Sequence, residues 1–133
     1  MTVAVAHQIS STTAIALREA VLEACRRKTD LAVLHVVESI DADREDAYKA
    51  GIADDIERAL GQEPEVVWKL HLVTSATPSL GGKLVALADT VGAELLVIGA
   101  RRRSPVGKAL LGSVTQTVIL EANVPVLVVK APA

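Results

Sequence analysis

Five short apolar runs punctuate this chain, and a segment with helical periodicity separates each run from the next. The runs cover Thr2–Ala6, Leu31–Val37, Glu65–Val73, Glu94–Ile98 and Val126–Val129. Strands that are joined through helices lie parallel, and parallel strands covered on both faces consist of aliphatic residues. The order β-α-β-α-β-α-β-α-β therefore predicts an α/β, Rossmann-like fold: a single open five-stranded parallel sheet sandwiched by four helices, in one domain over residues 1–133.

Capping residues and glycines predict where the helices begin and end. The first helix is expected from Ser10–Thr12 to Arg26–Lys28, the second from Asp41 to Leu60, the third from Thr77–Pro78 to Val91, and the fourth from Ser113 to Ala122. Gly61 and Gly92 are the predicted stops of the second and third helices, and Pro125 opens the last strand. The third strand has mixed polarity on one of its faces, which predicts a sheet edge.

Charge and composition argue against several classes of function. The net charge is −2 and aromatic residues make up 2% of the chain, whereas DNA- and RNA-binding proteins need a basic face or aromatic stacking platforms. The N-terminus lacks the features of a signal peptide and no apolar stretch has the length of a membrane span, so we expect a cytoplasmic protein without a membrane partner. The lone Cys25 is expected to be a buried thiol. The pair His35 and His71 lacks further ligands, so we expect no metal site.

The segment Ala100–Leu111 is too long for an ordinary connection in such a fold and has no hydrophobic period. It follows the carboxyl end of a strand, which is the side where open α/β sheets bind ligands. The backbone amides at the start of the next helix form an anion site, and nearby cations add positive charge. These residues are Gly112, Ser113, Val114 and Thr115, with Arg101, Arg102, Arg103 and Lys108. A phosphate-bearing ligand is one interpretation, and a solvated basic surface loop is the other.

Two common phosphate-binding motifs do not fit this segment. A Walker A loop would require glycine where Arg102 stands and serine or threonine where Ala109 stands. A dinucleotide fingerprint would follow the first strand, where Ala6-His7-Gln8 contains no glycine. The serines Ser79, Ser104 and Ser113 lack a nucleophile elbow, so we name no catalytic residue.

A third motif fits much better. Its spacing is a glycine, two residues, a second glycine, nine residues, and then glycine with serine or threonine. Gly99, Gly112 and Ser113 occupy three of these positions, and Arg102 occupies that of the second glycine. With Leu34-His35-Val36, Thr77-Pro78 and Asn123–Val129, the pattern resembles the universal stress protein family over essentially the whole chain.

The resemblance implies a strand order 3-2-1-4-5, a dimer formed through the last strand with Val126 and Val128, and an adenine nucleotide as ligand. ATP or AMP is the candidate cofactor, and none is required. Phosphates would contact Gly99, the arginines Arg101 and Arg102, and the segment Gly112–Thr115. Ala6, His7 and Val36 would lie on the adenosine side. In the nucleotide-binding members the first strand ends in an aspartate, and Ala6 stands at that place here.

Two departures from the family pattern leave alternatives open. Ala6 offers no carboxylate to a nucleoside. Arg102 replaces a glycine, and if that glycine is required for positive φ or close backbone approach, an arginine there is strained or forces another path of the segment. The guanidinium of Arg102 could instead bind phosphate. The leading interpretation is a nucleotide-responsive regulatory or stress-response homodimer rather than an enzyme. The alternatives are an interaction module that has lost nucleotide binding and serves an unknown protein partner, and a weak ATPase, although Ala100–Leu111 contains no acidic residue.

Overall fold

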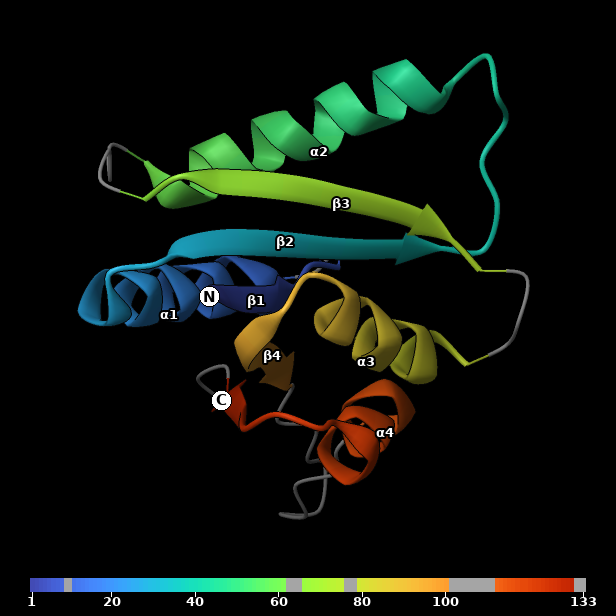
Figure 1. The fold of residues 1–133 in the computed structure, drawn as a ribbon. Coiled ribbons are helices and arrows are strands. Elements are labelled where there is room, and N and C mark those ends of the chain that lie inside the picture. The colour runs from blue at the N-terminus through green and yellow to red at the C-terminus, as the bar shows by residue number, and fades with distance from the viewer. Residues whose placement is uncertain (9–10, 62–65, 76–78, 101–111, 131–133) are drawn as a thin grey trace, which may run out of the picture.

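The computed structural model describes residues 1–8, 11–61, 66–75, 79–100 and 112–130. Helices and strands alternate along these residues (Figure 1). They are β1 (Thr2–Ala6), α1 (Ser11–Arg27), β2 (Asp30–Val37), α2 (Glu45–Leu60), β3 (Trp68–Thr74), α3 (Leu80–Thr90), β4 (Ala93–Ala100), α4 (Ser113–Glu121) and β5 (Val126–Lys130).

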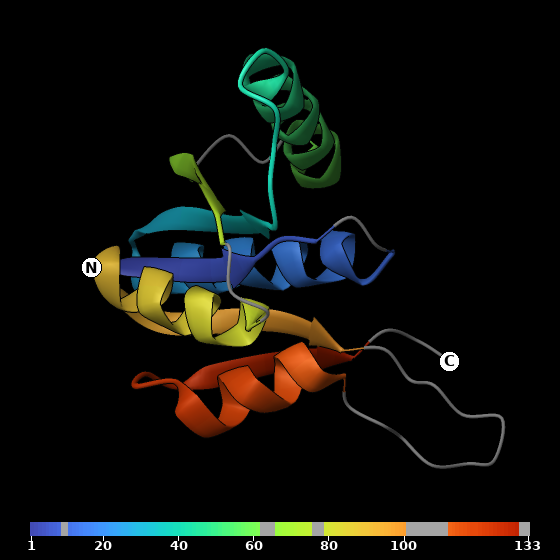
Figure 2. The same ribbon diagram turned by 90° about the vertical axis from the view of Figure 1, so that its right-hand side faces the viewer.

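The strands form one sheet in the order β3-β2-β1-β4-β5, and every neighbouring pair is parallel. The predicted fold class and strand order are therefore confirmed. β1 lies in the middle of the sheet, with β3 and β5 at its two edges. Because all five strands run the same way, the carboxyl ends of β1, β2 and β4 meet at one edge of the sheet (Figure 2).

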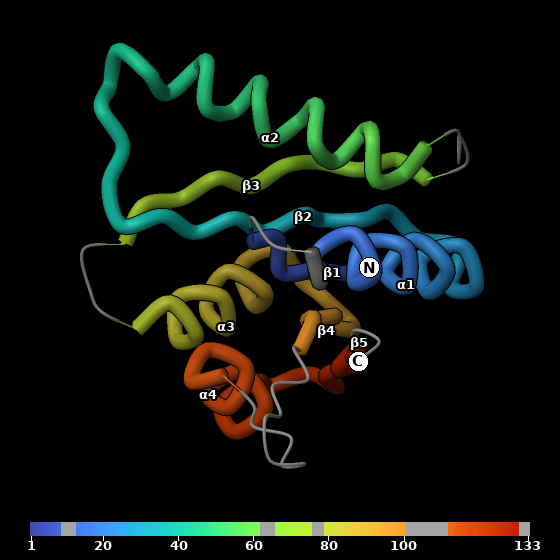
Figure 3. Tube along the Cα trace, turned by 180° about the vertical axis from the view of Figure 1, so that it is seen from behind, coloured from blue at the N-terminus to red at the C-terminus, as the bar shows by residue number. Residues whose placement is uncertain are grey.

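Each face of the sheet buries its own aliphatic core. Val3 and Val5 of β1 belong to a core shared with α1 and α2, while Ala4 and Ala6 belong to a second core shared with α3 and α4. This separation follows from the strand itself, because successive side chains point to opposite faces. α2 lies beside β3, which is an edge strand of the sheet (Figures 1 and 3).

Several predicted boundaries were wrong by a few residues. α2 begins at Glu45 rather than Asp41, because the Asp41 carbonyl accepts a hydrogen bond from the Arg44 amide in a turn that precedes the helix. β3 begins at Trp68 rather than Glu65, which lies outside the described residues. The proposed cap Thr77 also lies outside them.

The structural cap of α3 is Ser79, whose Oγ accepts a hydrogen bond from the Gly82 amide at 3.1 Å. The predicted stops are in place: Gly61 follows α2, and Gly92 follows α3 with a φ of 69°, a conformation that favours glycine. Cys25 is exposed, contrary to the sequence prediction. α1 buries Leu17, Val21 and Ala24 on its core face, and Cys25 lies beyond the edge of this face.

α3 and α4 approach each other closely at Gly81. A Cβ atom placed on Gly81 would lie 2.6 Å from Thr117 Cβ and 3.0 Å from the backbone oxygen of Val114. The glycine that weakens α3 as an isolated helix therefore permits the contact with α4. This contact holds the start of α4 next to the sheet.

Candidate functional site

A small cleft lies where the carboxyl ends of β1 and β4 meet the start of α4. The residues that line it are Ala6, Gln8, Thr13, Ile98, Gly99, Val114 and Thr115. They come from three parts of the chain that are far apart in the sequence: residues 6–13, 98–99 and 114–115. The position agrees with the rule that open α/β sheets bind ligands beyond the carboxyl ends of their strands.

Local structure explains how each wall of this cleft is built. β1 ends at Ala6, and the turn that follows is closed by Thr13, whose hydroxyl donates to the Gln8 carbonyl. The Gln8 amide in turn contacts Thr13 Oγ1 at 3.3 Å. On the other wall α4 begins at Ser113, after Gly112 in an extended conformation. The first backbone bond of α4 joins the Gln116 amide to the Gly112 carbonyl at 3.0 Å.

The structure brings together four of the residues named from sequence: Ala6, Gly99, Val114 and Thr115 line the same cleft. Gly112 and Ser113 are exposed at the start of α4 beside it. Val36 does not line the cleft, although it packs on the same face of the sheet as Ala6. Arg101 and Arg102 lie outside the described residues. Val126 and Val128 are half-buried on β5 and pack against the core beneath α3 and α4.

Gln8 and Thr13 were not named by sequence reasoning. Gln8 is the first polar residue after His7 on the chain leaving β1, and its exposed amide can reach a ligand. The signal in the sequence was its place two residues beyond a buried strand, since ligands bind beyond the carboxyl ends of the strands in this fold class. Thr13 is buried in the first turn of α1 and fixes the path of the chain at Gln8.

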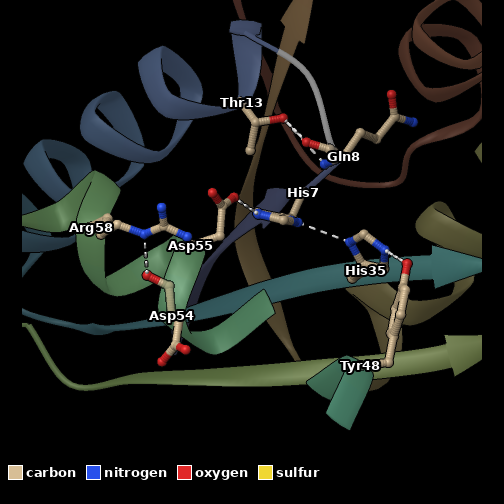
Figure 4. Close-up of polar contacts among 8 residues, drawn as sticks. All are labelled: His7, Gln8, Thr13, His35, Tyr48, Asp54, Asp55 and Arg58. Atoms are coloured by element: carbon tan, nitrogen blue, oxygen red, sulfur yellow. Dashed lines mark hydrogen bonds and ion pairs between the residues drawn. The ribbon is translucent and has the colours of Figure 1, made fainter. Parts of the chain in front are cut away.

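His7 lies apart from Ala6, on the opposite face of the sheet. Figure 4 shows it between Asp55 of α2 and His35 of β2. His7 Nε2 lies 3.2 Å from Asp55 Oδ2, His7 Nδ1 lies 2.9 Å from His35 Nδ1, and His35 Nε2 lies 2.9 Å from the Tyr48 hydroxyl. Both histidines are buried, with exposed fractions of 1% and 4%. The four side chains form one continuous chain of hydrogen bonds.

The acceptor at one end of this chain determines every proton position along it. The Asp55 carboxylate can only accept, so His7 Nε2 carries a proton and His7 Nδ1 is the bare nitrogen of a neutral ring. His35 must then donate from Nδ1, which leaves its Nε2 to accept from the Tyr48 hydroxyl. When both rings are neutral, each hydrogen bond is therefore donated in the direction of Asp55: from Tyr48 to His35, from His35 to His7, and from His7 to Asp55.

Burial favours the neutral form of both rings. It lowers the pKa of His7, although the hydrogen bond and the negative charge of Asp55 oppose this effect. Burial, together with the proximity of His7, lowers the pKa of His35 to about 4. A cleft of about 360 Å³ opens beside these rings, and its walls are His7, Ala47, Tyr48, Gly51, Ile52, Asp55 and Arg58.

Two other kinds of site are not found in the part of the chain that the structure describes. Those residues contain no group of three or more histidine, cysteine or acidic side chains placed to hold a metal ion. They also contain no helix that is long and apolar enough to cross a membrane.

Comparison with known proteins decides the family. A profile of the Universal stress protein family matches residues 1–130. The chain belongs to the universal stress protein family. A curated relative described as a universal stress protein, from Mycolicibacterium smegmatis, is 39% identical over 121 residues, which is 86% of each chain.

Two solved universal stress proteins share the fold along nearly their whole length. The structure of a universal stress protein from Archaeoglobus fulgidus is 34% identical, covers 98% of each chain and superposes with a TM-score of 0.76. A structure of the universal stress protein from the same organism in complex with dAMP is 29% identical, also covers 98% of each chain, and has a TM-score of 0.71. The family resemblance inferred from Gly99, Gly112 and Ser113 is thereby confirmed.

Proposed function

We propose that this universal stress protein binds an adenine nucleotide in the cleft between β1, β4 and α4 and acts as a regulatory protein rather than an enzyme. The observation that carries the proposal is the gathering of Ala6, Gly99, Val114 and Thr115 around one cleft at the carboxyl edge of the sheet. The related protein that was solved in complex with dAMP supports an adenine nucleotide as the ligand.

The phosphates would lie at the start of α4. The amides in the first turn of a helix have no partner within the helix, and they point toward an incoming anion together with the positive end of the helix dipole. Ser113 adds an exposed hydroxyl at this point. Arg101 and Arg102 would supply positive charge from the adjoining segment.

The nucleoside would lie against the end of β1. Ala6 has no polar side chain, so the carboxylate expected in nucleotide-binding relatives is missing at that position. The exposed Gln8 amide can both donate and accept a hydrogen bond, and we propose that it contacts the nucleoside. Val36 lies outside this cleft on the same face of the sheet, so a nucleoside would contact it only by extending beyond the cleft toward β2.

Calorimetric titration with AMP and ATP at low salt tests the proposal. Wild-type protein should bind, and Ser113→Glu should weaken AMP binding at least about tenfold, because it places a negative charge at the phosphate amides. Gln116→Glu adds the same charge one turn further along α4 and should have a smaller effect. Absence of heat with wild-type protein at millimolar nucleotide would overturn the proposal and favour an interaction module with an unknown protein partner.

Arg102 separates two versions of the phosphate site. If the segment needs a glycine conformation at this position, Arg102→Gly should increase ATP affinity. If the guanidinium binds phosphate, the same change should decrease it. Unchanged affinity would show that residue 102 does not contact the nucleotide.

We also propose that the protein is a homodimer that pairs along β5, as expected from sequence. β5 is an edge strand, and Leu120 on the neighbouring α4 is an apolar side chain with 82% of its surface exposed. Leu120→Glu should therefore shift the protein toward monomer in analytical ultracentrifugation. Leu22→Glu, at an exposed position on α1, is the matched control. A wild-type monomer at micromolar concentration would refute the dimer.

A further inference from the structure

The second cleft, between α2 and the end of β1, has the composition of a binding site. Its volume of about 360 Å³ lies within the range of about 300 to 1,000 Å³ that is typical of small-molecule pockets. Ala47, Gly51 and Ile52 form an apolar wall. The polar walls come from the hydrogen-bonded chain and from Arg58, and the buried pair of histidines has lowered pKa values, which is a common property of functional sites.

We propose that this cleft binds a small carboxylate together with one proton, and that the chain Asp55–His7–His35–Tyr48 carries the proton. This cleft lies on the opposite face of the sheet from the cleft between β1, β4 and α4. The proposal is therefore independent of nucleotide binding. Figure 4 shows the four side chains in line, with Arg58 on the same helix as Asp55.

The hydrogen-bonded chain can accept one proton without losing a bond. The Tyr48 hydroxyl proton moves to His35 Nε2, and the His35 Nδ1 proton moves to His7 Nδ1. The Tyr48 oxygen regains a proton from the cleft. Each of the three hydrogen bonds is kept, and those on either side of His35 reverse direction, so that Tyr48 now accepts from His35. The added charge resides on the His7 imidazolium, beside the Asp55 carboxylate at 3.2 Å.

Proton uptake changes what the cleft can bind. With His7 neutral, the charges of Asp55 and Arg58 cancel; with His7 protonated, the cleft has a net positive charge. The Tyr48 hydroxyl also becomes free to donate into the cleft. Arg58 contacts the Asp54 carbonyl through Nε at 3.5 Å, and a guanidinium of this kind binds carboxylates in a planar, two-pronged manner. The apolar wall suits a carboxylate with an apolar body rather than inorganic phosphate.

The surroundings add few other charges to the histidine pair. Among the described residues, the charged or titratable groups that face it are Asp55, Tyr48 and Arg58, all on α2. The core on this face of the sheet is aliphatic and includes Leu17 of α1, Leu72 of β3 and Val97 of β4. The proton balance of the cleft is therefore set by α2 and the two histidines.

Titration with benzoate tests the proposal, in buffers of different protonation enthalpy so that the protons taken up are counted. Affinity should rise about tenfold to thirtyfold between about pH 7.5 and about pH 6, with close to one proton taken up per benzoate at the higher pH. Nitrogen chemical shifts of the imidazoles should show the proton of His35 moving from Nδ1 to Nε2. Inorganic phosphate should bind more weakly than benzoate.

Three variants and one control locate the effect. Arg58→Gln should weaken benzoate binding about tenfold at every pH, whereas the control Arg26→Gln, exposed in the last turn of α1, should not change it. His7→Gln should bind benzoate without proton uptake. Asp55→Asn should also lose the pH dependence, and it retains the fold because its side chain is half-exposed and its oxygen still accepts from His7. No binding of benzoate by wild-type protein, binding without proton uptake, or tighter binding of phosphate would each overturn the proposal.

Discussion

Gly81 is the position at which one added methyl group is expected to damage both the fold and the nucleotide cleft. Alanine is favoured over glycine within a helix by about 1 kcal/mol, so propensity alone predicts that Gly81→Ala stabilises the protein. The new Cβ, however, would lie 2.6 Å from Thr117 Cβ, 2.8 Å from Thr117 Cγ2 and 3.0 Å from the Val114 oxygen. A backbone oxygen cannot turn aside, so α4 must move away from α3. Overpacking of this kind costs about 1 to 3 kcal/mol, so after the gain in propensity we expect a net loss of up to about 2 kcal/mol.

Urea unfolding followed by circular dichroism measures this change, and Gly51→Ala is the matched control. Gly51 also lies within a helix, but a Cβ there would have no atom within 4 Å, so we expect it to stabilise by about 0.5 to 1 kcal/mol. AMP affinity should fall in Gly81→Ala, because Val114 lines the cleft, and should be unchanged in Gly51→Ala. If both variants are stabilised equally, the close approach of α3 and α4 does not exist as described.

Three further substitutions or conditions test other contacts. Ser79→Ala removes the cap of α3 and should lower the free energy of unfolding by about 1 kcal/mol in urea titrations. Thr13→Val removes the hydroxyl that closes the turn at Gln8; it should cost about 1 to 2 kcal/mol and weaken AMP binding in calorimetry. Stability should also fall with acidification. Because burial lowers the pKa of His35 from about 6.5 to about 4, the unfolded chain binds the proton more readily between these values. The free energy of unfolding should therefore fall by on the order of 3 kcal/mol as the pH is lowered from about 6.5 to about 4. Trp68 fluorescence in urea titrations at several pH values measures this fall. His35→Gln should flatten the dependence.

The architecture could be predicted from sequence because its signals are local. Five apolar runs separated by helical segments specify a parallel α/β sheet, and Gly61 and Gly92 marked two helix ends correctly. Boundaries set by particular hydrogen bonds were not predictable in this way. The turn that joins Asp41 to Arg44 delays α2, and no residue type in that segment announces it.

Sequence reasoning predicted only those residues of the candidate site that belong to one continuous motif. Gly99 and Val114 were named from a motif that lies in a single stretch of the chain, and they line the cleft. His7 was grouped with Ala6 because the two are adjacent, although the two-residue period of a strand sends them to opposite faces. The hydrogen-bonded chain could not be found from sequence, because Asp55 lies 48 residues beyond His7 and its position depends on how α2 packs.

The end of β1 connects the two clefts through the backbone rather than through side chains. Ala6 lines the cleft beside α4, and the next residue, His7, belongs to the hydrogen-bonded chain on the other face. Gln8 then returns to the first cleft. The His7 amide also donates to the Leu34 carbonyl at 2.8 Å, which holds this residue in register with β2. A ring that is bonded at both nitrogens and anchored by its amide has little freedom to move, so His7 fixes the direction in which the chain leaves the sheet and thereby the position of Gln8. Alternation along three consecutive residues thus lets one strand end support two sites of different chemistry without sharing a side chain between them.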